Sequence, residues 1–84
     1  MNKLKMMREA KGLSQSQFAK LSKISVRTLQ HYEQGTRSIN GIAGITLYHM
    51  AKALECEIVD ILELEPEDEE EERQKKLNYL LMGN

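Results

Sequence analysis

The chain has 84 residues and a net charge of −1, with 40% hydrophobic and 30% charged residues. This length suits one small domain, whose core cannot support an elaborate active-site cleft. A single cysteine excludes an intramolecular disulfide and a zinc site built from cysteines, and no apolar run reaches the ~18 residues of a membrane span. The first residues lack the apolar core of a signal peptide, so a cytoplasmic protein is expected.

Charge is divided unevenly along the chain. Residues 1–40 carry eight Lys or Arg against two Glu, a net +6, whereas residues 41–84 carry four against eleven acids, a net −7. This asymmetry predicts one surface that attracts a polyanion and one that does not. The overall charge of −1 therefore does not argue against a nucleic-acid partner.

An all-α fold is expected, because capping signals and helical spacing run through the chain without sustained period-two alternation. Asn2 can cap a first helix that runs to about residue 11 and places Leu4 and Met7 on one face. Gly12 then ends this helix.

Two short helices follow, separated by a break of three or four residues. Ser14 and Gln17 form a capping box at the start of the first, while Ser25 caps the second and Gly35 ends it. The helices are predicted over residues 14–21 and 26–34. The residues of the first that are expected to face the core are Phe18, Ala19 and Leu21. This spacing predicts a helix-turn-helix.

The next part of the chain is predicted as a loop and two further helices. Residues 36–44 contain two glycines and indicate a loop. Helical spacing then predicts a fourth helix from its apolar residues, which are Ile45, Leu47, Met50, Ala51 and Leu54. A fifth, short helix is predicted over residues 57–62.

The composition changes at Pro66, so residues 1–65 are expected to form a domain and residues 66–84 an acidic extension. Proline at the start, six acids early and bases later favour a helix and its dipole. Three uses of this extension stay open: dimerisation, packing on its own domain, or an acidic cover over the basic face. Dimerisation would use a seam of Leu77, Leu80 and Leu81.

Several segments carry a family resemblance. Residues 13–19, 24–29 and 32–35 resemble the phage-repressor and Cro-like helix-turn-helix family of DNA-binding proteins, the XRE type. Leu4 and Arg8 fit the first helix of that family, and residues 51–62 resemble its last two helices. The resemblance covers residues 2–64. It implies a compact five-helix, repressor-like domain with its motif at 14–34, to which this chain adds a charged C-terminal helix.

Two features depart from the family pattern. Lys23 stands in the turn between the motif helices, where the family usually has a small residue, often glycine. Lysine adopts the backbone conformation of such a turn less readily than glycine. In addition, the loop before the fourth helix is longer than in the smallest members, and the charged extension lies outside the resemblance.

The resemblance also implies the DNA contacts, because the second motif helix of the family enters the major groove. The implied base-contacting residues are Ser25, Val26, Arg27, Thr28, Gln30 and His31. Arg27 can pair with guanine through two hydrogen bonds, and Gln30 can bond adenine or reach a phosphate instead. The implied phosphate-contacting residues are Ser14, Gln15, Gln34, Thr36, Arg37 and Ser38, of which the first two stand at a helix N-terminus.

Arg8 and Glu33 resemble a structural ion pair of the family, so a scaffold role is expected for them. His31, His49 and Cys56 are predicted on different helices without the spacing of metal ligands, so neither a metal nor a cofactor is expected. Cys56 is instead expected to be a small, buried apolar residue. No nucleophile, metal or phosphate-loop spacing indicates an enzyme.

Together these features predict a sequence-specific double-stranded DNA-binding protein that regulates transcription, a repressor at an operator in a bacterium or phage. Such proteins bind as dimers to half-sites about one turn, ~34 Å, apart. The alternative is a protein-interaction module, such as an antitoxin, whose C-terminal segment binds a partner.

Overall fold

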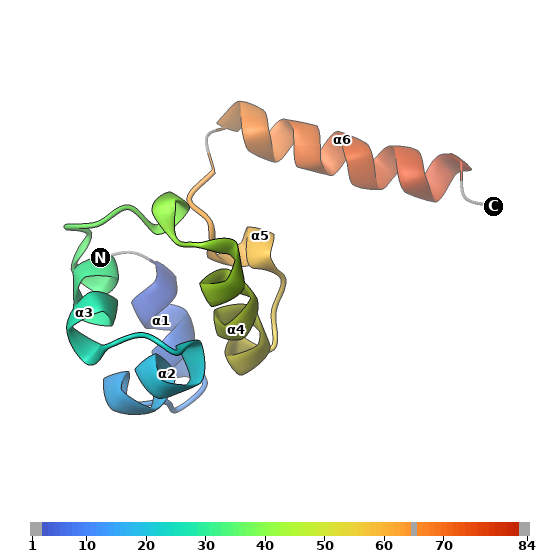
Figure 1. Ribbon diagram of the computed structural model, residues 1–84. Coiled ribbons are helices and arrows are strands. Elements are labelled where there is room, and N and C mark those ends of the chain that lie inside the picture. Colours follow the sequence, from blue (N-terminus) through green and yellow to red (C-terminus); the bar gives the residue numbers. More distant parts are fainter. Residues whose placement is uncertain (1–2, 65, 83–84) are drawn as a thin grey trace.

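The protein is all-helical in its computed structural model, which describes residues 3–64 and 66–82 (Figure 1). The elements, in chain order, are α1 (Lys3–Ala10), α2 (Gln15–Ser22), α3 (Val26–Gln34), the 3-10 helix η1 (Ile39–Gly41), α4 (Gly44–Leu54), α5 (Ile58–Ile61) and α6 (Pro66–Met82). The all-α prediction is confirmed. Asn2, the predicted cap of the first helix, lies outside the described residues.

One apolar core joins α1 to α5. Each of these helices, and η1, contributes a side chain that is fully buried: Leu4, Phe18, Leu29, Ile39, Met50 and Ile61. Burying a side chain of this size stabilises the fold by ~1.5–3 kcal/mol. Because α2 packs against both α3 and α4, the core fixes the angle between the two helices of the predicted motif.

Leu21, which was predicted to face the core, lies on the surface instead, and so does Ile45, one of the apolar residues from which the fourth helix was predicted. Leu21 is half exposed, and Ser22 occupies the buried position beside it in α2. Ile45 is 66% exposed in α4. The buried set of α4 recurs every three or four residues from Leu47 onward, and Ile45, two residues before Leu47, falls on the opposite side of the helix.

The segment predicted as a loop contains η1 and contributes two buried side chains, Ile39 and Ile42. These isoleucines are three residues apart, so one turn of 3-10 helix places them on the same side. The Asn40 side chain ties the segment to the chain after α5, since its Nδ2 donates to the Glu63 carbonyl at 2.9 Å and its Oδ1 accepts from the Glu63 N–H at 3.0 Å. The segment is therefore part of the folded core.

Lys23 ends α2 in the left-handed conformation, with φ 60° and ψ 39°. Its N–H donates to the Lys20 carbonyl, and the next N–H, of Ile24, reaches the Ala19 carbonyl. This is the conformation that glycine adopts without steric cost and that costs other residues roughly 1–2 kcal/mol. The departure from the family pattern is thus accommodated by strain in the turn between α2 and α3.

Lys23→Gly is expected to raise the free energy of unfolding by about 0.5–1 kcal/mol, because the relief of strain exceeds the entropy that glycine loses on folding. Urea denaturation followed by circular dichroism measures this change. Lys20→Gly is the matched control: Lys20 is exposed in the same helix with right-handed backbone, so it should lose ~1 kcal/mol. A loss of stability in Lys23→Gly would show that the turn is not strained.

The C-terminal helix α6 runs past α5 and away from the bundle of α1 to α5 (Figure 1). Its apolar side chains are uncovered: Leu77 is half exposed and Leu80 and Leu81 are 77% and 76% exposed. Arg73 pairs with Glu70, one turn earlier, at 3.0 Å. Residues 66–82 therefore form a helix, as the sequence predicts, and within the described part of the chain its Leu80 and Leu81 side chains remain largely uncovered.

Candidate nucleic-acid interface

α2 and α3 pack against each other and are joined by the short turn around Lys23. Local signals set the bounds of α3. Ser25 Oγ accepts from the Thr28 N–H at 3.0 Å at its start, and Gly35, with φ 82°, ends it. These bounds agree with the prediction from the sequence. Because Leu29 is fully buried, the opposite side of α3 faces outward.

Arg27 is the most available side chain on the outward side of α3. It is exposed, and it has no hydrogen bond or ion pair with any residue in the described ranges. It lies two residues before Leu29, which places it about 200° around the helix from the core-facing side. Its guanidinium is therefore free to meet a ligand.

Other residues implied as base contacts already make contacts within the protein. The hydroxyl of Ser25 is exposed and donates to Thr28 Oγ1 at 2.9 Å, in addition to capping α3. Val26 is half-buried against the core. The Nδ1 of His31 lies 2.8 Å from Thr36 Oγ1, which joins α3 to the segment after it.

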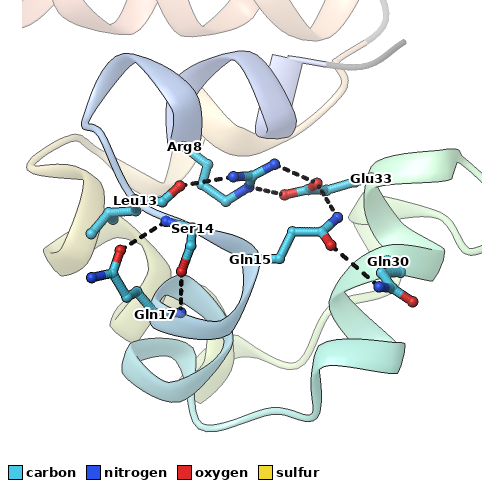
Figure 2. Close-up of polar contacts among 7 residues, drawn as sticks. All are labelled: Arg8, Leu13, Ser14, Gln15, Gln17, Gln30 and Glu33. Carbon is cyan, nitrogen blue, oxygen red and sulfur yellow. Dashed lines mark hydrogen bonds and ion pairs between the residues drawn. The ribbon is translucent and has the colours of Figure 1, made fainter.

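A chain of polar contacts links α1, α2 and α3 beneath this surface (Figure 2). Arg8 Nε donates to Glu33 Oε2 at 2.6 Å, and Arg8 Nη2 donates to Glu33 Oε1 at 3.1 Å. Both residues are buried, with 6% and 5% of their surfaces exposed. Arg8 Nη1 also donates to the Leu13 carbonyl at 2.8 Å. The hydrogen bond to Glu33 raises the pKa of Arg8. The two side chains lie inside the fold and join α1 to α3, which suits a structural role.

The chain continues outward through two glutamines. Gln15 Nε2 donates to Glu33 Oε1 at 3.1 Å, and Gln30 Nε2 donates to Gln15 Oε1 at 3.2 Å (Figure 2). Reasoning from the sequence treated Gln15 and Gln30 as separate contacts and missed that they bond each other. The sequence places Gln30 and Glu33 three residues apart on one side of α3, but it gives no signal that Gln15 of α2 lies beside them.

The residues implied as phosphate contacts lie at the start of α2 and after α3. Ser14 Oγ accepts from the Gln17 N–H at 3.0 Å, and Gln17 Oε1 accepts from the Ser14 N–H at 2.8 Å, so the predicted capping box is present. Gln34, the last residue of α3, is exposed, and so are Thr36, Arg37 and Ser38 in the segment that follows it. The Arg37 guanidinium lies 5.7 Å from the centre of the Tyr32 ring, a contact that orients it.

Charge on this part of the molecule favours an anionic ligand. Of the eight Lys or Arg and two Glu in residues 1–40, Arg8 and Glu33 neutralise each other inside the fold. The remaining seven bases and one acid carry a net +6, and one of these bases, Lys11, is paired with Glu55 at 2.7 Å. A surface of this charge attracts polyanions over several ångströms at moderate salt.

The histidine and cysteine side chains away from α3 take part in packing. The His49 ring meets the Tyr48 ring edge-on, with 5.3 Å between centroids. Cys56 is half-buried against the core, so its predicted burial is only partial, and burial raises the pKa of its thiol. Within residues 3–64 and 66–82, no three His, Cys, Asp or Glu side chains are grouped to hold a metal ion.

The packed pair of α2 and α3, with the exposed Arg27 on the outward side of α3, has the arrangement of a helix-turn-helix DNA-binding domain. The family model described as Helix-turn-helix matches residues 4–61, more than two thirds of the chain. The chain belongs to this family, in its XRE type, and is a DNA-binding protein of the class that regulates transcription. A search of curated proteins found no significant match. None of the described helices is both long and apolar enough to cross a lipid bilayer.

Proposed function

We propose that the protein is a sequence-specific repressor that occupies an operator in the cytoplasm of a bacterium or a phage-infected cell. The observation that carries this proposal is the exposed Arg27 guanidinium in the first turn of α3, which has no partner within the described part of the chain. Arginine reads guanine through paired hydrogen bonds to O6 and N7 in the major groove.

Neighbouring side chains complete the proposed base-reading surface. Ser25 and Thr28 flank Arg27 with hydroxyl groups, and the methyl groups of Val26 and Thr28 suit a thymine methyl. His31 extends this surface along α3. Gln30 is tied to Gln15, so in the proposal it orients Gln15 toward a phosphate instead of reading adenine.

The phosphate contacts would position α3 in the groove. Ser14 and Gln15 lie at the start of α2, where backbone N–H groups favour an anion. The DNA backbone on the other side of the groove would be contacted by residues at the end of α3 and just after it: Gln34, Thr36, Arg37 and Ser38. Repression then follows from occupancy, because a protein bound at an operator obstructs RNA polymerase. A homodimer would read two half-sites about one turn, ~34 Å, apart.

Fluorescence anisotropy tests the proposal. The protein is titrated into labelled duplexes from its own upstream region and into a scrambled duplex, at several salt concentrations. We expect preference for one duplex and an affinity that falls with salt, with a log–log slope of about −0.9 per phosphate neutralised. Equal and weak binding to both duplexes would contradict sequence-specific recognition.

A second function has one observation in its favour. The uncovered leucine cluster on α6 is suited to a protein partner, as in an antitoxin whose C-terminal segment binds a toxin. Hydrogen exchange in the presence of a captured partner tests this alternative. Protection confined to residues 66–82 would favour it, whereas unchanged exchange there would count against it.

A further inference from the structure

A cleft lies between α4 and α5. These two helices are on the other side of the bundle from α3 (Figure 1). Its apolar surface comes from Tyr48, which is 47% exposed, and Ile58, which is 37% exposed. The half-buried Cys56 also lines the cleft. Glu57 and Asp60 are exposed acids at the same cleft. The lining also includes Glu55 and one base, Lys52, whose Nζ lies 5.5 Å from the centre of the Tyr48 ring. The cleft therefore combines apolar side chains with three acids against one base.

The second half of α6 has the complementary chemistry. Residues 73–82 contain three bases and no acid. Leu77, Leu80 and Leu81 are spaced i, i+3 and i+4, so they share one side of the helix, and all three are exposed. This half of α6 is a basic helix with an uncovered leucine face.

Pairing between two α6 helices does not bury this leucine face well. A parallel pair would set the six acids at residues 67–72 of one helix beside the same six acids of the other. The leucine cluster spans only residues 77–81, so an antiparallel pair joined at the two clusters would bury three leucines from each helix, and an overlap that reaches residues 67–72 would place leucines beside acids. A surface on the bundle is the better match for α6.

The α6 helix of the same chain does not fill the cleft. Lys76 is the α6 residue that shares a hollow with α5, where it lies near Glu57, Ile58 and Val59. Leu80 and Leu81 stand beyond this point and stay three-quarters exposed. The basic part of α6 thus already adjoins the acidic and apolar surface of α5, while its leucines remain available to another molecule.

We propose that residues 73–82 of one copy dock in the α4–α5 cleft of a second copy, and that the exchange is reciprocal. The leucines cover Tyr48 and Ile58, and the bases of α6 face Glu57 and Asp60. A twofold arrangement buries both leucine clusters at once. This contact would hold together the homodimer of the proposed function. The inference rests on that function only where the dimer is used to read two paired half-sites.

Cys56 allows a direct test, because it is the one cysteine in the chain and it lines the cleft. Leu80→Cys is oxidised under mild conditions as the full-length chain and examined on a non-reducing gel and by peptide mass spectrometry. We expect a disulfide between Cys56 and the new cysteine, in a dimer. A mixture of isotopically labelled and unlabelled copies should yield the hybrid peptide, which proves that the bond joins two chains.

The matched control is Asn78→Cys, which lies about 200° around α6 from Leu80 and should not cross-link to Cys56. Leu80→Asp should leave the chain monomeric in sedimentation at concentrations where the wild type dimerises. Disulfides between two copies of the introduced cysteine would overturn the proposal in favour of α6–α6 pairing. A bond within one chain, or a monomeric wild type, would overturn it as well.

The same variants separate this inference from DNA recognition. If Leu80→Cys does not cross-link to Cys56 while the wild type still distinguishes its duplex from the scrambled one, the docking inference fails and the DNA-binding function stands. If the cross-link forms but neither duplex is preferred, the operator proposal fails and the dimer stands.

Discussion

Arg27→Ala is expected to reduce the preference for the recognised duplex over a scrambled duplex by about 5- to 150-fold, which corresponds to ~1–3 kcal/mol for one bidentate base contact. Arg27 is exposed at the start of α3, and no described residue occupies its guanidinium. Binding to the scrambled duplex should weaken less, since it depends on phosphate contacts. Anisotropy titrations of both duplexes at one salt concentration measure the effect.

Two further variants sharpen this prediction. Arg27→Lys keeps the charge but loses the paired donors, so it should retain binding to the scrambled duplex and still lose much of the preference. Lys20→Ala removes an exposed cation of α2 that lies outside the proposed base-reading surface, and it should leave the preference unchanged. An equal loss on both duplexes in Arg27→Ala would show that Arg27 contacts phosphate and does not read a base.

Arg8→Ala is expected to lower the free energy of unfolding by ~3–5 kcal/mol. The substitution leaves the Glu33 carboxylate buried without its cation and removes the hydrogen bond to the Leu13 carbonyl. Domains of this kind have total stabilities of only ~5–15 kcal/mol, so the loss would bring the fold close to unfolding. Urea denaturation followed by circular dichroism gives the free energy, and DNA binding should fall only as far as the folded fraction falls.

The exposed pair of Arg73 and Glu70 supplies the control, because its side chains are 70% and 73% exposed. Arg73→Ala should cost no more than about 1 kcal/mol. The double substitution of Arg8 by Met and Glu33 by Leu should recover much of the lost free energy of unfolding, because no buried charge is then left without a partner. Normal unfolding of Arg8→Ala combined with lost DNA binding would refute the scaffold role.

Local signals explain why the bounds of α3 could be predicted from the sequence. Ser25 and Gly35 act through backbone geometry within a few residues, and the capping box of Ser14 and Gln17 does the same for α2. The sequence shows less clearly which side of a helix faces the core. Leu21 and Ile45 are apolar, yet neither lies on the side of its helix that meets the neighbouring helices.

The residues proposed for the interface could be named from the sequence, but the hydrogen bonds among them could not be predicted. Arg27 and its neighbours follow from their positions on α3. The bonds that tie Gln30 to Gln15, and Gln15 to Glu33, depend on how α2 and α3 cross, which spacing along one helix cannot supply. The same holds for α6, whose helical pattern was evident while its uncovered leucines became clear only from the packing.

The outward side of α3 is the surface that we propose contacts the DNA. The most direct measurement is an amide chemical-shift titration of the isotopically labelled protein with the preferred duplex. We predict that the largest shifts fall in residues 25–31 and at Ser14 and Gln15, with little change in the second half of α6. Shifts that concentrate on α4, α5 or α6, and leave residues 25–31 unchanged, would contradict this account.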